Sequence, residues 1–138
     1  MIVENKGSSP SSKAREHAGG TVSAAHDSAA VLIYTTFPSA DEAKNAGRRL
    51  VESKLAACVN VFPQMTSIYE WEGKVTEDAE AAMIVKTAAA RSAEALQEIK
   101  RLHPYSVPAR LVLPVIGGGE DFLSWINTQC GIGAGGDD

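Results

Sequence analysis

The stretch from Met65 to Thr87 limits the possible folds of this chain more than any other stretch. Side chains in a strand alternate between two faces, so Tyr69 and Trp71 would share one face of its first half. The alternation resumes after Gly73, and glycine supplies the unusual backbone angles that a tight reversal needs. The stretch therefore predicts a β-hairpin that turns at residues 72–74.

The incoming arm of this hairpin is long. Its strand signal begins upstream at Ala57 and is interrupted only by Pro63, whereas a typical strand has about 5–6 residues. The tip would project beyond the core and hold aromatic side chains and unpaired backbone groups in water, which is unfavourable unless another surface covers them. A second copy of the chain would provide that cover, so we expect a homo-oligomer built through the hairpin.

The size and composition of the chain predict one domain and exclude several classes of protein. A chain of 138 residues with 44% hydrophobic residues is long enough for one core and too short for two ordinary domains. A formal net charge of −4, without a block of one sign, argues against a nucleic-acid partner. No apolar run approaches the about 20 residues that span a bilayer, so we expect a soluble protein without membrane association.

The ends of the chain differ from its middle. Residues 1–29 are small and polar without any period and predict a flexible arm, residues 30–130 form the domain, and residues 131–138 predict a flexible tail. The arm lacks the basic start and apolar stretch of a secretory signal. The two cysteines, Cys58 and Cys130, lie in unlike contexts and do not suggest a disulfide framework. We therefore expect a cytoplasmic protein.

Hydrophobic periodicity assigns the elements before and after the hairpin. A β-branched run at residues 31–36 predicts a strand, and a capping box formed by Ser39 and Glu42 begins a helix that extends to Leu55. A second helix is predicted from about Ala88 to His103. Its expected core stripe consists of Ala89, Ala93, Leu96, Ile99 and Leu102.

The last elements follow Pro104, which ends the second helix. Residues 111–116 predict a strand, and Pro114 within it indicates an edge position or a bulge. A short closing helix has Phe122, Trp125 and Ile126 on one face. The resulting order, β-α-β-β-α-β plus a helix, predicts an α+β domain with both helices on one face of an antiparallel sheet. The other face would be bare, which again indicates burial between subunits.

Two residues of the domain are candidates for binding a metal ion. Cys58 and His103 offer a thiolate and an imidazole, which suit copper and zinc better than magnesium or calcium. Each also has a structural explanation. Free cysteine is often a small buried hydrophobic residue, and a protonated imidazole at a helix C-terminus gains about 0.3–1 kcal/mol from the helix dipole.

A second set of residues suggests a ligand cleft. Tyr69 and Trp71 are either interface anchors or the lining of a cleft between subunits. In the second case Lys86 and Tyr105 are further cleft residues, and the positive charge of Lys86 would attract an anion. The acidic residues near the hairpin tip are expected to form a solvated face. The sequence contains neither a phosphate-binding loop nor an arguable Ser-His-carboxylate set, so we expect no enzyme and no organic cofactor.

Six short strings occur in one uninterrupted order: LAACVN from Leu55, SIYEWEGK from Ser67, MIVKT from Met83, HPYSVP from His103, LPVI from Leu113 and FLSWIN from Phe122. Together they resemble the CutA divalent-cation-tolerance family, and the resemblance covers about residues 31 to 129. The resemblance implies a ferredoxin-like fold, a homotrimer in which the long hairpins join edges between neighbours, and tolerance to divalent cations, notably copper. Two positions depart from the family pattern, because residues 34–38 lack a cysteine and Ala109 replaces a glutamate.

The sequence therefore predicts a trimeric protein that binds copper or zinc in response to metal ions, with Cys58 and His103 as ligands. The alternative is a trimeric signalling or scaffold protein that binds a small anionic ligand in its inter-subunit clefts. A third possibility is an assembly module whose function lies in the N-terminal arm. The first hypothesis needs the soft ligands, whereas the second needs Lys86 and Tyr105.

Overall fold

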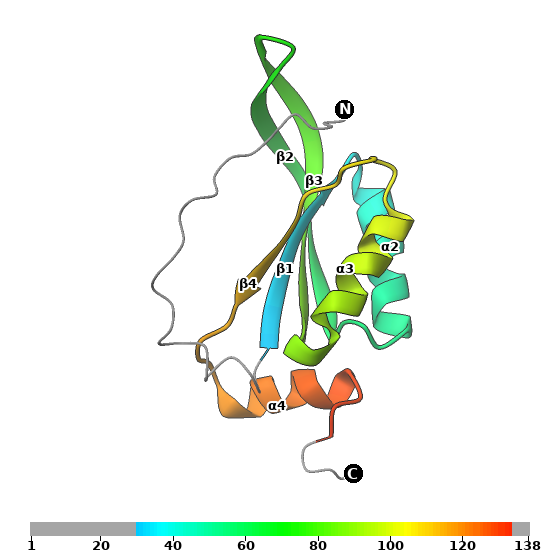
Figure 1. Ribbon diagram of the computed structural model, residues 1–138, viewed down its shortest axis with the longest axis vertical. Helices are drawn as coiled ribbons and strands as arrows, with labels where there is room; N and C mark the ends of the chain where they lie inside the picture. Colours follow the sequence, from blue (N-terminus) through cyan, green and yellow to red (C-terminus); the bar gives the residue numbers. More distant parts are fainter. Residues whose placement is uncertain (1–29, 134–138) are drawn as a thin grey trace.

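The computed structural model describes residues 30–133 and contains four strands and three α-helices in the predicted order. The expected arm, 1–29, and most of the expected tail lie outside the described residues. The elements, labelled as in Figure 1, are β1 (Ala30–Phe37), α2 (Ala40–Glu52), β2 (Cys58–Trp71), β3 (Lys74–Ala88), a 3₁₀ turn (Ala89–Arg91), α3 (Ser92–Leu102), β4 (Arg110–Pro114) and α4 (Glu120–Gln129).

The four strands form one antiparallel sheet in the order β2-β3-β1-β4. Helices α2 and α3 lie on one side of this sheet, and α4 lies across the lower end in Figure 1. The predicted α+β class and ferredoxin-like order are confirmed. Strand β4 is at an edge, as Pro114 indicated. Within residues 30–133, none of the helices has the length and apolar composition of a membrane span.

The predicted hairpin is confirmed, and its turn lies at Glu72 and Gly73. Trp71 pairs with Lys74, and the two turn residues have φ angles of 52° and 83°. Two consecutive positive φ angles are typical of the type I′ turn, whose twist matches that of the flanking strands. The hairpin extends well beyond the helices in Figure 1.

A β-bulge divides the hairpin into two parts. Phe62 pairs with Ala82, whereas the next pair is Met65 with Glu80, so Pro63 and Gln64 stand opposite the single residue Ala81. The extra residue reverses the alternation of β2, and Phe62 and Met65 therefore point to the same face of the sheet. Proline is tolerated here because β2 is an edge strand and a bulge residue leaves the ladder.

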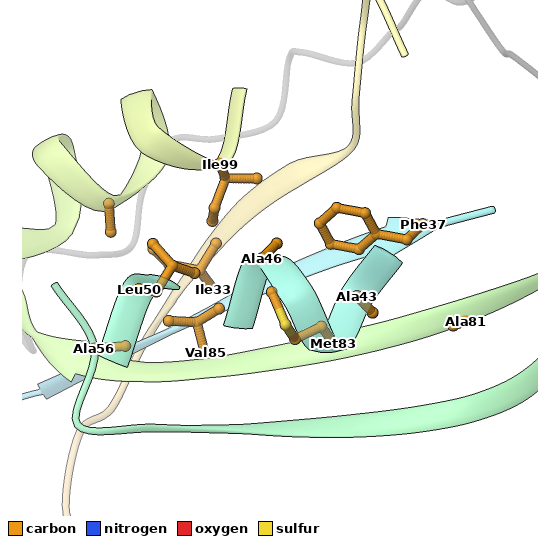
Figure 2. Packing of buried hydrophobic residues seen from close by; sticks show 11 residues of the cluster. Ile33, Phe37, Ala43, Ala46, Leu50, Ala56, Ala81, Met83, Val85 and Ile99 are labelled. Carbon is orange, nitrogen blue, oxygen red and sulfur yellow. The ribbon is translucent and has the colours of Figure 1, made fainter. Parts of the chain in front are cut away.

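The core lies between the sheet and the two helices α2 and α3 (Figure 2). Ser39 caps α2 by accepting a 3.2 Å hydrogen bond from the Glu42 N–H, as the capping box predicted. Gly47 packs so closely on the sheet that a Cβ atom there would lie 2.6 Å from Val59 Cγ2. The largest fully buried core side chains are Phe37, Ile33, Leu50, Met83, Ile99 and Val85.

The core stripe predicted for the second helix is wrong in part. Ala95 and Ile99 are the buried residues of α3, and Ala93 is exposed. The predicted helix begins instead as a 3₁₀ turn, which has about 3.0 residues per turn and so changes the phase of the helix that follows.

A smaller cluster joins α4 to the lower end of the sheet. It contains Ala30, Ala57, Ala88, Ile126 and Cys130, and Ile132 packs against it. Cys130 Sγ lies 3.3 Å from the Thr87 hydroxyl. Cys58 and Cys130 are both free thiols. The predicted boundaries at residues 30 and 130 stay predictions.

On the sheet face opposite α2 and α3, α4 covers only the lower end, and no other element within residues 30–133 covers the rest. Registers place Phe62 of β2, Tyr34 of β1 and Leu111 and Leu113 of β4 on this face. Phe62, Leu111 and Leu113 are 53%, 60% and 44% exposed. One face of the sheet is therefore apolar and open, as the element order predicted.

Candidate functional site

The six predicted site residues divide into two groups at opposite ends of the sheet. Tyr69 and Trp71 lie on the projecting part of β2, and Tyr105 and His103 lie in the loop beside it. Cys58 and Lys86 form a cross-strand pair at the other end, near α4. One chain therefore brings four of the six residues toward the hairpin and separates them from the other two.

Beside the first group, two carboxylates accept hydrogen bonds from three hydroxyl groups. We call Ser67, Tyr69, Asp78, Glu80 and Tyr105 the hairpin-base cluster. Glu80 accepts from Ser67 at 2.6 Å and from the Tyr105 hydroxyl at 2.7 Å, one bond to each carboxylate oxygen. Tyr69 donates to Asp78 at 2.5 Å. The cluster thus ties the hairpin to the loop between α3 and β4.

The two tyrosines of the cluster remain protonated over a wide pH range. Loss of water contacts, followed by the hydrogen bond to Asp78, raises the pKa of Tyr69 to about 12. Burial raises the pKa of Tyr105 further, with the hydrogen bond to Glu80 as the second cause. Both hydroxyls therefore act as hydrogen-bond donors to the carboxylates at neutral pH.

His103 is buried at the C-terminal end of α3, and both of its ring nitrogens are engaged. Its Nδ1 accepts a 3.1 Å hydrogen bond from the Tyr105 N–H. Its Nε2 lies 2.5 Å from the Thr36 carbonyl oxygen. Because an N–H only donates and a carbonyl only accepts, the imidazole is neutral and carries its proton on Nε2.

The surroundings of His103 favour this neutral form. Its ring stacks on Phe37 with centroids 4.3 Å apart and lies 4.8 Å from the Tyr105 ring. Burial lowers the pKa of His103, opposed by the Thr36 hydrogen bond and by the negative charges of Glu42 and Glu80. The dipole explanation of His103 requires a protonated imidazole, and the structure does not provide one, because Nδ1 accepts a hydrogen bond.

The second group lies beside the C-terminal helix. Cys58 is half-buried opposite Lys86, whose Nζ lies 5.5 Å from the centre of the Phe122 ring. Phe122 stacks on Trp125. Cys58 also lines an open cavity of about 420 Å³ at the β2 edge, together with basic side chains of α2, Lys44 and Arg48. Cys58 is therefore more exposed than Cys130, which is buried.

A single chain does not assemble the predicted metal site. Cys58 pairs with Lys86, whereas His103 contacts Thr36, whose partner on β3 is Ala82. Along the strand direction the two positions are four residues apart, which is about 13 Å. Across the sheet they are two strand spacings apart, which is about 10 Å. Within residues 30–133 no three His, Cys, Asp or Glu side chains form a group that could hold a metal ion. The donors in this described part of one chain therefore do not form a site that fits a copper or zinc ion.

The role of Glu80 and Asp78 was not predicted, because both stand among the acidic residues near the hairpin tip that were expected to form a solvated face. The signal was present in the turn. Counting outward from Glu72 and Gly73 places Asp78 opposite Ser67, on the same face as Tyr69. The contact of Glu80 with Tyr105 had no local signal, because 25 residues separate them.

Comparison with known proteins identifies a family. The family model described as CutA1 divalent ion tolerance protein matches residues 31–129. The divalent-cation tolerance protein CutA of Thermus thermophilus is 40% identical over 100 residues, which cover 72% of this chain and 97% of that protein. The corresponding protein of Archaeoglobus fulgidus is 46% identical over 96 residues, which cover 70% and 93%.

Solved structures agree with this result. CutA1 from Ehrlichia chaffeensis superposes with a TM-score of 0.73 at 33% identity and covers 75% of this chain and 96% of its own. The Archaeoglobus protein superposes with a TM-score of 0.70 at 42% identity, with coverages of 73% and 98%. That protein is described as periplasmic, so the cytoplasmic location of the present chain stays a prediction.

Proposed function

The chain belongs to the CutA1 divalent ion tolerance protein family, and we propose that it acts in tolerance to divalent cations as a homotrimer that binds copper or zinc. The names of the relatives state tolerance to cations and not a catalysed reaction, and the proposal includes no catalysis. The observation that carries the assembly is the open apolar sheet face. A small domain rarely leaves such a face in water.

The free edges of the sheet support a closed ring of copies. Strands β2 and β4 are the two edges, and each presents unpaired backbone groups. Pairing the β2 edge of one copy with the β4 edge of the next would satisfy these groups and turn the open faces toward a common axis. Such head-to-tail contacts form a ring when the rotation closes. The family resemblance suggests three copies.

The proposed metal site centres on Cys58. Cys58 is a half-buried residue of the edge strand β2, where a neighbouring copy would lie, and thiolates favour copper and zinc. Because the donors at residues 30–133 of one chain do not form a site, the remaining ligands would come from another copy. Pairing of Cys58 with His103 stays a prediction, and it requires one ring nitrogen of His103 to lose its present hydrogen bond.

Titration of metal-stripped protein with copper and zinc tests this proposal. The variants are Cys58→Ser, His103→Gln and, as the matched control, Cys130→Ser, which changes the buried thiol. We expect stoichiometric binding to the wild type and to the control, and binding at least about tenfold weaker, or about 1.4 kcal/mol, in Cys58→Ser. Equal binding by all proteins would exclude Cys58, and an effect of His103→Gln would restore the predicted pair.

The alternative function, binding of a small anion in inter-subunit clefts, has one observation in its favour. Lys86 is a half-buried cation beside exposed aromatic side chains of α4. Lys86 and Tyr105 lie at opposite ends of one sheet, so this cleft would need Lys86 from one copy and Tyr105 from another. Phosphate binding that Lys86→Met abolishes and Cys58→Ser leaves unchanged would favour the alternative.

A further inference from the structure

The β-bulge gives the hairpin a natural point of bending. The pairing between β2 and β3 is interrupted at Pro63 and Gln64 and resumes at Met65 and Glu80. Bulges bend the strand that carries them and leave one residue unpaired. The tip of the hairpin extends past the helices in Figure 1, so we expect contacts near the base of the hairpin to set its direction.

Glu80 is the first residue of β3 on the projecting side of this bulge, and its carboxylate is held from two sides. Ser67 donates to one oxygen from within the hairpin, and the Tyr105 hydroxyl donates to the other from the loop that leads into β4. Hydrogen bonds to a charged acceptor are stronger than those between neutral groups. Tyr105 therefore connects the projecting hairpin to the body of the domain immediately beyond the bulge.

Tyr105 is positioned in turn by His103. The Tyr105 N–H is fixed on Nδ1 of the imidazole, and the opposite nitrogen is anchored to the Thr36 carbonyl at the end of β1. Phe37 and Tyr105 flank the ring. The imidazole thus bridges the core strand β1 and the loop, and it can do so only with an unprotonated Nδ1.

We propose that His103, Tyr105 and Glu80 form a latch that fixes the hairpin relative to the domain at the bulge, and so holds it ready for contact with a second copy. The role in assembly rests on the proposed homo-oligomer, whereas the latch itself does not. Fixing a binding element in advance strengthens association, because less conformational entropy is lost on contact.

The charges around the latch come from several elements. Glu42 of α2 and Glu80 of β3 face His103, as does Arg110 at the start of β4. Arg49 of α2 lines the same small cavity as the imidazole, and Lys100 and Arg101 occupy the last turn of α3. The two carboxylates favour a protonated imidazole and the basic groups disfavour it. The two hydrogen bonds of the ring decide which nitrogen holds the proton.

Hydrogen exchange of the full chain tests the latch through a pair of matched substitutions. Tyr105→Phe removes the hydroxyl that bridges loop and hairpin, and Tyr69→Phe removes a hydroxyl that bonds Asp78 within the hairpin. We expect Tyr105→Phe to speed amide exchange about tenfold, which corresponds to about 1.4 kcal/mol. The faster exchange should occur beside the bulge, at residues 62–67 and 79–82, and in the loop, at residues 103–109. Exchange in α2 should not change.

Tyr69→Phe should leave the loop at its wild-type exchange rate. The latch is refuted if Tyr105→Phe leaves amide exchange at the wild-type rate beside the bulge and in the loop. It is also refuted if the two substitutions change the exchange rate of the loop equally. Nitrogen NMR of the imidazole gives a second test that needs no substitution. We expect protonated Nε2 and unprotonated Nδ1, and the opposite tautomer would overturn the proposed bridge.

Dilution followed by light scattering separates the latch from the proposed assembly. If the wild type is an oligomer, Tyr105→Phe should dissociate at concentrations about tenfold higher, and equal dissociation would remove the role in assembly. If the wild type is a monomer at every concentration, the proposed homo-oligomer fails. The exchange and tautomer measurements then still decide whether the latch exists.

Discussion

Replacing Gly47 by alanine tests how tightly α2 packs on the sheet. A Cβ atom at this position would lie 2.6 Å from Val59 Cγ2 and 3.2 Å from Met83 Sδ. The first distance is too short, and valine cannot move easily because its β-branched side chain is restricted at χ1. Overpacking of this kind costs about 1–3 kcal/mol.

The intrinsic helix preference acts in the opposite direction. Alanine is better than glycine inside a helix by about 0.8–1.0 kcal/mol. The net expectation for Gly47→Ala is therefore a loss of about 0–2 kcal/mol in the free energy of unfolding. Shortening the neighbour should reverse the sign, because Val59→Ala removes the methyl group that the new Cβ meets.

Urea unfolding of the wild type, both single variants and the double variant at one protein concentration measures this effect. In the Val59→Ala background, Gly47→Ala should stabilise the protein by up to about 1 kcal/mol. The coupling between the two sites is the predicted quantity. If Gly47→Ala has the same effect in both backgrounds, the close approach of α2 to β2 does not limit this position, and the packing argument is refuted.

Three further predictions follow from the core, the turn and the buried imidazole. Leu50→Ala should lower the free energy of unfolding by about 2–5 kcal/mol. Its control, Val75→Ala, changes a residue that is 78% exposed and should alter this free energy by less than about 0.5 kcal/mol. If urea unfolding shows similar losses for the two variants, the assigned core is contradicted. Gly73→Ala should destabilise the hairpin by about 1 kcal/mol because φ is 83°, and an unchanged urea midpoint would show that this turn is not strained. The pKa of His103 is lowered in the folded protein, so the neutral imidazole contributes its full stabilisation above the unfolded pKa of about 6.5. This contribution is lost as the pH falls through the lower folded pKa. His103→Gln should remove this part of the pH dependence of the free energy of unfolding, and a pH dependence that persists in the variant would assign it to another group.

Local chemistry made several elements predictable from sequence. Gly73 located the turn because few other residues accept its backbone angles, and Ser39 located the start of α2 through its capping hydrogen bond. Pro114 indicated an edge because it cannot donate to a neighbouring strand. Each signal depends on one residue and its immediate neighbours.

The candidate site was less predictable because it depends on distant contacts. Thr36 and His103 are separated by 67 positions, and the tautomer that their hydrogen bond fixes cannot be read from either residue alone. The bulge at Pro63 also changed which side chains share a face. Cys58 and His103 were paired because their side chains prefer the same metals. That preference does not show how far apart the sheet places the two residues.

The mass of the protein in solution tests the central claim most directly, because the proposed metal site and the role of the latch in assembly both require contact between copies. Light scattering over a dilution series should give three times the chain mass of 14.5 kDa, and Leu113→Glu on the open face should lower it. A wild-type mass of one chain at all concentrations would contradict the account, because the open sheet face would then be stable in water.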